Sequence, residues 1–433
     1  MNLEFFIAKR VALSESKSFA RLIIRIAMVS VAISVAVMII TTSMISGFKK
    51  EISRKIFGFW GHIHITDPDV NRTLLEAYPV SMDQPFYPSL DSVGRIDYPI
   101  TKMAFGQEVG RIVRTKGGIH HIQTFAVKPG IIKAKSEIEG IILKGVGMDF
   151  DWKFINSYIQ EGEALSLQDT AMSSDIMISR QTADRLRVGV GDRFIVHFVE
   201  KGEQLKRRFT IKGIYKTGLD EFDRKFALVD IRQIQRLLGW TDKDVAGFEV
   251  FLDDIDDLIP MADYIYYDKI PPNSNLYVET IREKFPEIFE WLDLQNVNEK
   301  VILILMVIVA IINMITALLI LILERTNTIG TLKALGFRNW GIQKIFLYYA
   351  SYIILVGLFW GNLIGIGLCF LQDQYGFIRL SEADYYLSVA PVDINFFTIL
   401  ALNAGALVII LFALLLPSLL VMSISPVKAI RFK

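Results

Sequence analysis

Four long apolar runs dominate the pattern of hydrophobic and polar positions along the chain. They cover residues 26–46, 300–323, 345–371 and 394–424, and Lys300 is the one charged residue among them, at the edge of its run. A helix needs about 20 apolar residues to cross the hydrocarbon core of a bilayer. The pattern therefore predicts four transmembrane helices, and Pro417 lies near the end of the last one, where a kink is tolerated.

The stretch between the first two runs, residues 47–299, has a different pattern. Short alternating segments such as HIHIT (62–66) and DRFIVHFV (192–199) are separated by glycine and proline, which is typical of strands. Two helices interrupt them, one at 179–188 capped by Ser179 and one at 230–239 between Asp230 and Gly239. We expect a large α+β domain, divided into two subdomains near 162–168.

Apolar residues recur at helical spacing at both joins between this domain and the membrane. The pattern predicts amphipathic stalks that continue the first two spans outward. An alternative is that any helix leaving a membrane shows such a pattern, and Pro286 marks either a kink or a helix start. The apolar positions are Phe48, Ile52 and Ile56 after the first span, and Ile281, Phe285, Ile288 and Leu292 before the second.

Charge gives the orientation and excludes several functions. Basic residues gather before the first span, in 324–344 and in 425–433, so the positive-inside rule places these segments and both termini in the cytoplasm. Segments 47–299 and 372–393 are then external. A net charge of +1 gives no reason to expect nucleic acid, and Cys369 alone cannot form a disulfide framework.

The chain shows no means of powering transport by itself. Apart from Lys300 at the edge of one run, the four runs hold no ionisable side chain of the kind that relays protons or ions, and the sequence contains no phosphate-binding G-x-x-x-x-G-K-[ST] loop. We find no nucleophile–base pair and no metal-ligand cluster, so a membrane enzyme is the least favoured class. A partner must supply the energy.

The segment ERTNTIGTLKALGF (324–337) lies between the second and third spans. Ile329, Leu332 and Leu335 form a short apolar stripe, and Gly336 is placed to stop the helix. Such a helix is a docking element for a soluble partner or an interfacial helix on the lipid surface. Periodicity alone does not separate the two.

This segment resembles the signature of the FtsX-like permease domain. In that family it is the coupling helix that docks on an ABC-type ATPase. Thr328 stands where the family usually has an acidic residue, so a charge contact of that side chain is in doubt. The resemblance implies coupling positions at Glu324, Arg325, Thr328, Ile329, Gly330, Leu332, Lys333, Leu335 and Gly336, and Ala334 also matches.

Other stretches resemble the lipoprotein-releasing permeases of the LolC/LolE type. They include FIAKR (6–10), SRQTADRLRVGVGDRF (179–194) and TIREKFPEIFEWLDLQNVNEKV (280–301). This resemblance implies a non-catalytic permease of the bacterial inner membrane that works as a homodimer or heterodimer, with ATP and Mg²⁺ bound by a separate ABC ATPase. It would extract lipoproteins from the outer leaflet and hand them to a periplasmic carrier.

The resemblance also implies a lipid-binding cavity between spans. Flexible apolar side chains on the first two spans suit acyl chains, although ordinary packing or lipid contact is the commoner reason for methionine at any one position. The candidates are Met38, Met44, Phe48, Met306 and Met314.

One segment departs from the LolC pattern. Residues 200–206 form a short charged hairpin turn around Gly202, where LolC-type subunits have an extended loop that captures the carrier. Either the chain is of the LolE type, or its carrier is recruited differently. An FtsX-type regulator of cell-wall hydrolases and a MacB-like extruder of another substrate are the alternative functions.

The remaining polar and small residues suggest structural roles. Gly357, Gly361 and Gly365 repeat every fourth residue in the third span, which allows close helix packing. Asn313, Asn362 and Asn403 are expected to form hydrogen bonds between spans. His62 and His64 share a strand face, but with no third ligand evident we expect structural histidines and no metal site.

Overall fold

The computed structural model describes residues 19–68, 78–104, 107–134, 137–168, 171–200 and 202–423. The FIAKR motif, the basic residues before position 19 and the tail from 424 lie outside the described residues. The chain divides into a helical unit, Met1–Glu51, Glu290–Arg379 and Val389–Lys433, and a sheet domain, Ile52–Phe289 and Leu380–Ser388.

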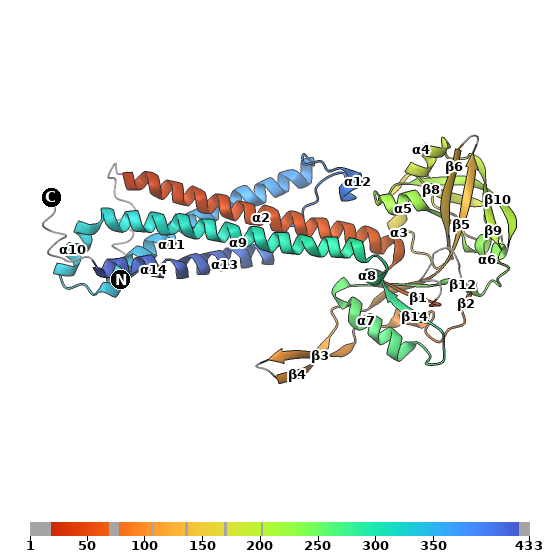
Figure 1. Ribbon diagram of the computed structural model, residues 1–433, viewed down its shortest axis with the longest axis horizontal. Helices are drawn as coiled ribbons and strands as arrows, with labels where there is room; N and C mark the ends of the chain where they lie inside the picture. Colours follow the sequence, from red (N-terminus) through yellow and green to blue (C-terminus); the bar gives the residue numbers. More distant parts are fainter. Residues whose placement is uncertain are drawn as a thin grey trace. The chain divides into compact units, whose positions relative to one another are not determined.

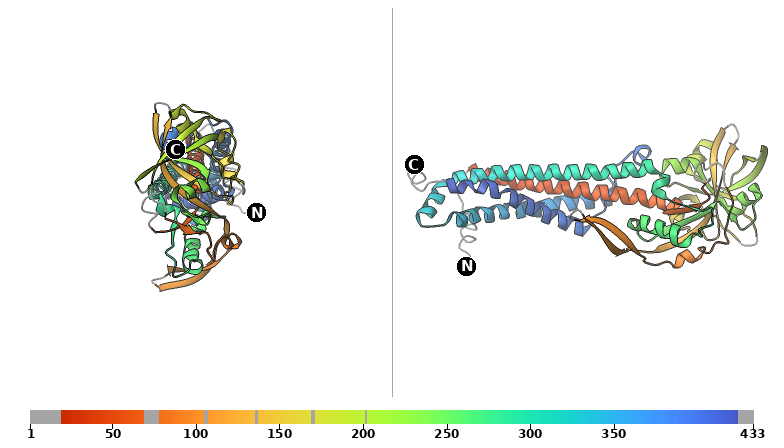
Figure 2. Two further views of the ribbon diagram at one scale, coloured as in Figure 1. Left: turned by 90° about the vertical axis from the view of Figure 1, so that its right-hand side faces the viewer. Right: turned by 60° about the horizontal axis from the view of Figure 1, so that its bottom comes forward.

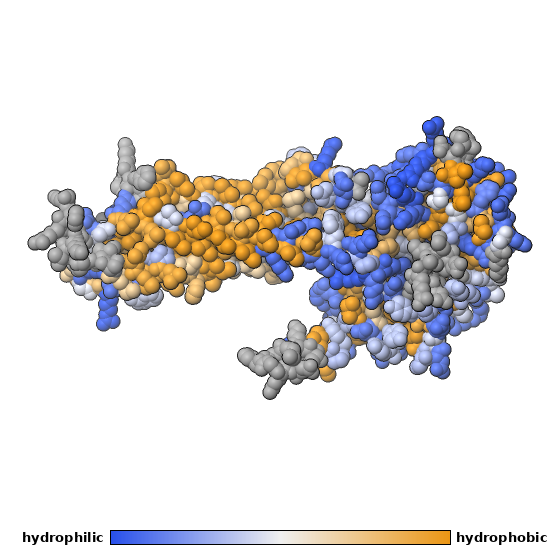
Figure 3. All heavy atoms as spheres, viewed as in Figure 1, coloured by the Kyte–Doolittle hydropathy of each residue, from blue (hydrophilic) through white to orange (hydrophobic). Residues whose placement is uncertain are grey.

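Four long helices run side by side in the helical unit (Figures 1 and 2). They are α2 (Phe19–Trp60), α9 (Pro286–Glu324), α11 (Asn339–Tyr375) and α13 (Phe396–Ala413), and α10 (Thr326–Ala334) joins α9 to α11. Each of the four is long and apolar enough to cross a membrane, α13 together with the short helices that follow it. Figure 3 shows a broad apolar surface over this unit and a mostly hydrophilic one over the sheet domain. The fold class predicted from the sequence is confirmed.

The fourth span is interrupted near its end. Helix α13 stops at Ala413 and is followed by α14 (Leu415–Ser418) and α15 (Leu420–Ser423). Pro417 lacks an N–H group, and its ring clashes with the carbonyl four residues earlier, which is that of Ala413. The proline therefore explains why the helix breaks at this point.

The first two spans continue into the sheet domain without a break. Helix α2 has 42 residues and α9 has 39, whereas about 20 suffice to cross a bilayer. Pro286 is the first residue of α9, where its missing N–H has no helical acceptor, so it is a helix start and not a kink. Before it, the short α8 (Ile281–Lys284) is held by a capping box between Thr280 and Glu283.

Aromatic contacts pair the two helices beyond the spans. In the sheet domain the rings of Phe57 and Phe289 stack with centroids 6.0 Å apart. In the helical unit Phe48 packs edge-on against Trp291 at 5.2 Å, and Lys49 Nζ donates to Asn296 Oδ1 at 2.7 Å.

A ten-stranded mixed sheet forms the body of the sheet domain. Its order is β14-β1-β13-β5-β6-β11-β8-β10-β7, and β9 pairs with both β10 and β5. The strands are β1 (Ile63–Thr66), β5 (Ile119–Ala134), β6 (Glu137–Val146), β7 (Ile159–Gly162), β8 (Asp175–Ser179), β9 (Arg193–Glu200), β10 (Glu203–Tyr215), β11 (Phe226–Asp230), β13 (Gly247–Leu252) and β14 (Tyr277–Thr280).

Smaller elements surround this sheet. Two strand pairs lie outside it, β2 (Val80–Ser81) with β12 (Asp244–Val245) and β3 (Asp97–Ala104) with β4 (Gln107–Arg114). Besides α8, the helices between the strands of the domain are α3 (Lys153–Asn156), α4 (Arg180–Leu186), α5 (Asp220–Lys225), α6 (Ile231–Leu238) and α7 (Leu258–Tyr264).

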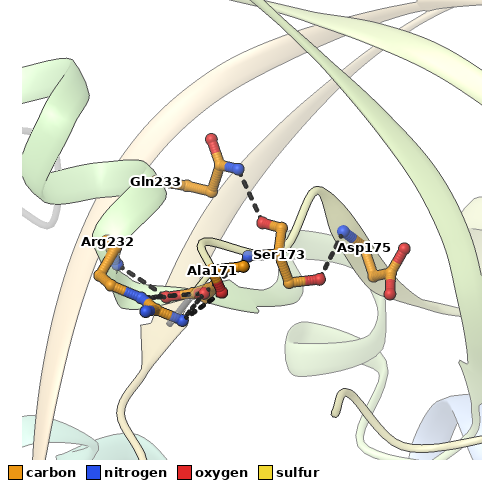
Figure 4. Close-up of polar contacts among 6 residues, drawn as sticks. Ala171, Ser173, Asp175, Arg232 and Gln233 are labelled. Atoms are coloured by element: carbon orange, nitrogen blue, oxygen red, sulfur yellow. Dashed lines mark hydrogen bonds and ion pairs between the residues drawn. The ribbon is translucent and has the colours of Figure 1, made fainter. Parts of the chain in front are cut away.

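Both predicted helices of the domain are confirmed with their caps. The Ser179 side chain accepts from the Thr182 N–H at the start of α4, and Asp230 accepts from the Arg232 N–H at the start of α6. Gly239 ends α6 with φ +70. Arg232 also donates to the Ala171 carbonyl, so the loop before β8 is fastened to α6 (Figure 4).

The predicted division near 162–168 is wrong. Strand β7 ends at Gly162 and β8 begins at Asp175, and both pair with β10 in the same sheet. Turn residues mark chain reversals, but they do not tell whether the strands on either side join one sheet. The hairpin prediction is confirmed, because β9 and β10 pair around a turn in which Gly202 has φ +83.

The connection between the third and fourth spans is partly built into the sheet domain. Leu380–Ser388, which contains α12 (Glu382–Tyr385), belongs to that domain. Lys216 forms an ion pair with Glu382 at 2.5 Å, and Lys55 donates to the Tyr386 carbonyl at 3.1 Å.

Candidate functional site

Helix α10 is a defined element with a glycine stop. Gly336 has φ +88, a conformation that a residue with a Cβ adopts only under strain. The Phe337 N–H donates to the Leu332 carbonyl and the Gly336 N–H to the Lys333 carbonyl, each at 3.0 Å. These bonds satisfy the last carbonyls of the helix.

The predicted apolar stripe of α10 is divided between two environments. Ile329 is 1% exposed and packs in the core of the helical unit, Leu332 is half-buried, and Leu335 is 74% exposed. The prediction that all three form one docking face is wrong, because α11 covers the Ile329 side of the helix through Ile345 and Phe346. Ile329 anchors α10.

The solvent-facing side of α10 is mostly polar. Asn327, Thr331, Ala334 and Leu335 are exposed at i, i+4, i+7 and i+8, and Thr328 is exposed beside them. Lys333 instead points inward, and its ammonium donates to the Val421 carbonyl at 2.8 Å and to the Met422 carbonyl at 3.2 Å. The face available to a partner is therefore small and neutral, with Glu324 exposed just before the helix.

The glycine repeat of α11 lies directly against α2. A Cβ added at Gly357 would stand 2.7 Å from Val31 Cγ1, and one at Gly361 would stand 2.8 Å from the Ala32 carbonyl oxygen. At Gly365 the nearest atom would be Ala36 Cα at 3.1 Å. The backbones approach this closely only because these residues lack side chains.

The asparagines of the spans form the predicted hydrogen bonds. Asn313 Nδ2 on α9 donates to Ser30 Oγ on α2 at 2.5 Å. Asn362 on α11 and Asn403 on α13 donate to each other, both at 2.8 Å. All three therefore join helices inside the helical unit.

The candidate lipid-binding residues do not share one open surface. Met38 and Met314 are only 2% and 1% exposed and belong to the core between the helices. Met306 is partly buried against the same core, Met44 is half-buried, and Phe48 packs on Trp291. Met38 and Met314 are thus packing residues, a role that their spacing in the sequence could not reveal.

Helix α9 carries a long exposed apolar row instead. The row continues from the span into the part of the helix that precedes it in the chain. Its spacing of three and four residues is that of a helix–helix seam. The residues are Leu294, Val297, Val301, Ile304, Ile308 and Ile312, each between 45% and 60% exposed.

A buried charge cluster, which we call the stalk junction, lies where α2 ends in the sheet domain. Lys144 on β6 forms an ion pair with Glu249 on β13 at 2.7 Å, and both side chains are fully buried. The Lys144 ammonium also donates to the Phe59 carbonyl at 2.5 Å and lies 4.5 Å from the centre of the Trp60 ring. A cation at a helix C-terminus stabilises the exposed carbonyls and the helix dipole.

A second lysine extends the stalk junction to α8. Lys284 Nζ donates to His64 Nδ1 at 2.9 Å, and His64 Nε2 donates to the Trp60 carbonyl at 2.5 Å. Lys284 also faces Glu279 at 3.6 Å. The cluster therefore joins the end of α2, the strands β1, β6, β13 and β14, and the helix that leads into α9.

Burial sets the protonation preferences of this cluster. It lowers the pKa of Lys144 and raises the pKa of Glu249, and the ion pair between them opposes both shifts. Burial, with Lys284 nearby, holds the pKa of His64 well below its ordinary value. His64 is therefore neutral, in agreement with a donating Nε2 and an accepting Nδ1.

Sequence reasoning missed the stalk junction. The available signal was one charged residue inside each of two short apolar stretches, Lys144 in IILKGV and Glu249 in GFEVFL. A buried charge is costly without a partner, so two such residues suggest a pair. Their separation along the chain hides which residues meet.

Two family models divide the chain between them. The model described as "MacB-like periplasmic core domain" matches residues 26–265, more than half of the chain, and "FtsX-like permease C-terminal" matches residues 300–426. The chain belongs to the MacB/FtsX-like permeases.

Within these permeases, the full-length relatives are of the LolC/LolE family. The lipoprotein-releasing system transmembrane protein LolC of Xylella fastidiosa strain 9a5c is 21% identical, with 100% of this chain and 98% of the relative covered. LolC of Neisseria meningitidis is 22% identical over 100% of both chains. LolE of Haemophilus influenzae is 21% identical, with 99% of each covered.

A likeness among solved structures is weak. The extracellular domain of the noncanonic ABC-type transporter YknZ from Gram-positive bacteria has a TM-score of 0.25 and 16% identity, covering 33% of this chain and 71% of that chain.

In the LolC/LolE permease described here, helix α10 lies within the FtsX-like match, and the stalk-junction residues Trp60, Lys144 and Glu249 lie within the MacB-like match.

Proposed function

We propose that the chain is the permease subunit of an ABC transporter that extracts lipoproteins from the outer leaflet of the bacterial inner membrane. A separate ABC ATPase binds ATP and Mg²⁺ and supplies the energy, and a periplasmic carrier receives the lipoprotein. Both termini and α10 lie in the cytoplasm, and the sheet domain lies in the periplasm. The names of the full-length relatives, which belong to lipoprotein-releasing systems, support this cargo.

The observation that carries the proposal is the way α10 is anchored. Ile329 is buried in the same helical core as Met38 of α2 and Met314 of α9, and Lys333 binds the backbone near the end of the fourth span. A force on the exposed face of α10 therefore moves a packed body and not a loose loop. Helices α2 and α9 then transmit the motion into the sheet domain.

This anchoring refines the roles of the coupling positions. Glu324, Thr328 and Leu335 are exposed and contact the ATPase. Ile329, Gly330 and Lys333 hold α10 in place, Arg325 and Leu332 lie at the boundary, and Gly336 shapes the end of the helix. Because Thr328 replaces an acidic residue, the contact depends on shape and hydrogen bonds more than on that charge.

The exposed row of α9 supports a second permease copy or a paralogue as a partner. Lipid would cover the part of the row inside the membrane, but Leu294 and Val297 lie outside the apolar run at 55% and 53% exposure. Apolar side chains at seam spacing in water favour burial against another helix. The lipid-binding cavity then lies between the two copies, beside Met44, Phe48 and Met306.

The test is affinity purification of the tagged full-length chain from native membranes in mild detergent, followed by mass spectrometry. A Thr331→Asp, Leu335→Asp variant alters only exposed positions of α10. The control is Val199→Asp, which places the same charge on an exposed residue of the sheet domain. Ile329→Asp is unsuitable, because a buried charge would unfold the segment whether or not it touches a partner.

We expect wild type and the control to recover an ABC ATPase together with lipoproteins, and the α10 variant to lose the ATPase. Retention of the ATPase by the α10 variant would reject the docking face. An ATPase recovered with cell-wall hydrolase regulators and without lipoproteins would favour the FtsX-type role. Another periplasmic cargo would favour a MacB-like extruder.

A further inference from the structure

A groove lies between α11 and the end of the fourth span, within the helical unit. Its volume is about 430 Å³, which is in the range of ligand pockets in proteins. One wall is formed by Trp340, Lys344 and Tyr348 of α11, at i, i+4 and i+8. The other is formed by Val408, Leu411 and Phe412 of α13.

The two walls differ in chemistry along the groove. The α13 wall is entirely apolar, with Val408 64% and Phe412 74% exposed. The α11 wall begins with Trp340, two residues after Arg338 and at the first turn of the helix, and continues to Lys344 one turn later. The Lys344 ammonium lies 5.8 Å from the centre of the Trp340 ring.

This arrangement matches a molecule with an anionic head and an apolar tail. Tryptophan and tyrosine favour the level of lipid headgroups, and lysine near a membrane surface attracts anionic lipids. Within the residues that the structure describes, Lys344 forms no ion pair with a carboxylate, so its charge is available to a ligand.

We propose that the groove binds one anionic phospholipid, with its phosphate at Lys344 and an acyl chain along Val408, Leu411 and Phe412. The site is separate from the proposed cavity for lipoprotein on α2 and α9, and it does not depend on the cargo. Bound lipid would fill the open side between α11 and α13, close to α10.

Two other occupants of the groove, the N-terminal segment and a second copy of the chain, are disfavoured. Residues 1–18 carry three basic side chains against two acidic ones, so this segment is net positive like the rim of the groove. A second copy of the chain has a better surface in the apolar row of α9, which bears no basic residue between Val301 and Ile312.

The test uses the delipidated full-length chain in detergent and native mass spectrometry. Phosphatidylglycerol and phosphatidylcholine with the same acyl chains are added separately. The wild type should bind phosphatidylglycerol about fivefold more tightly, which is the effect of one lysine near an anionic group. Lys344→Gln should abolish this preference, and Lys344→Arg should retain it.

Two further variants distinguish the contribution of the lipid headgroup to binding from that of the acyl chain. Val408→Trp fills the apolar wall and should weaken binding of both lipids, whereas Arg379→Gln removes a basic residue outside the groove and should change neither. Equal binding of the two lipids by wild type, or a preserved preference in Lys344→Gln, would overturn the proposal.

Occupancy by protein is tested with a single introduced thiol. In a Cys369→Ser background, Val408→Cys should react with a lipid-soluble maleimide and should form no disulfide-linked dimer under oxidation. A disulfide-linked dimer, or phosphatidylglycerol binding that arises only after deletion of residues 1–18, would overturn the proposal in favour of a second copy or the N-terminal segment.

Discussion

At the scale of single residues, the buried pair of Lys144 and Glu249 decides how α2 is held in the sheet domain. Removing one partner of a buried ion pair leaves an uncompensated charge, which costs far more than the net contribution of the pair. Here the loss would also free the Phe59 carbonyl at the end of α2.

We expect Lys144→Met to lower the free energy of unfolding of the sheet domain by about 3–5 kcal/mol. In Lys144→Met, Glu249→Gln, the glutamine still accepts from Gln123 without a charge, so most of the loss should be recovered. Denaturant unfolding of the full chain in detergent, followed by tryptophan fluorescence, measures both. A double variant as unstable as the single one would contradict a charge-compensation role.

His62 makes stability depend on pH. Burial, together with nearby His120, lowers the pKa of His62 to about 3, and its Nδ1 accepts from the Leu252 N–H at 3.1 Å. An unfolded histidine binds a proton below about pH 6.5, whereas folded His62 stays neutral. Protonation therefore favours the unfolded state, and stability is lost as the pH falls below about 6.5.

Between pH 7 and pH 5 this loss amounts to about 2 kcal/mol for His62 alone. His62→Gln keeps an acceptor for Leu252 and does not titrate, so its unfolding free energy should fall by about 2 kcal/mol less over this range. His197→Gln, on β9, is the control. Identical pH profiles for wild type and His62→Gln would show that His62 does not cause the dependence.

At the scale of elements, the glycine repeat of α11 fixes its distance from α2. Gly361→Ala would place a Cβ 2.8 Å from the Ala32 carbonyl oxygen, a backbone atom that cannot move without shifting the helix. Gly367 lies in the same helix with no atom near its added Cβ, so Gly367→Ala is a matched control.

We expect Gly361→Ala to destabilise the helical unit by about 1–3 kcal/mol, the usual cost of overpacking. Gly367→Ala should have little effect or stabilise slightly, since alanine favours a helix more than glycine does. Thermal unfolding in detergent distinguishes them. Equal midpoints for the two variants would mean that α11 and α2 are less closely packed.

Local elements were predictable from the sequence because their signals are local. Uncharged runs located the spans, and Ser179, Asp230, Gly239 and Gly202 marked caps and turns from their own backbone preferences. The orientation of α10 was not predictable. Ile329 and Leu335 are six residues apart, which places them about 120° apart around a helix. Only the packing of α11 determines which of them is covered.

At the scale of the whole molecule, contacts between segments far apart in the chain could not be predicted from the sequence. Leu380–Ser388 joins the sheet domain although it connects two spans, and the stalk junction brings together residues from β6, β13 and α8. No periodic pattern encodes such pairings. The family resemblance supplied the fold class and the proposed partners, but not these contacts.

The most direct test of the transport role is release of a lipoprotein from membranes. The chain would be reconstituted into liposomes containing a lipoprotein, together with the ATPase that co-purifies with the wild type. The soluble fraction would be assayed after adding ATP and a periplasmic carrier. We predict ATP-dependent release by wild type and none by Thr331→Asp, Leu335→Asp. ATP hydrolysis by the wild-type complex without any lipoprotein leaving the liposomes would contradict the proposed function.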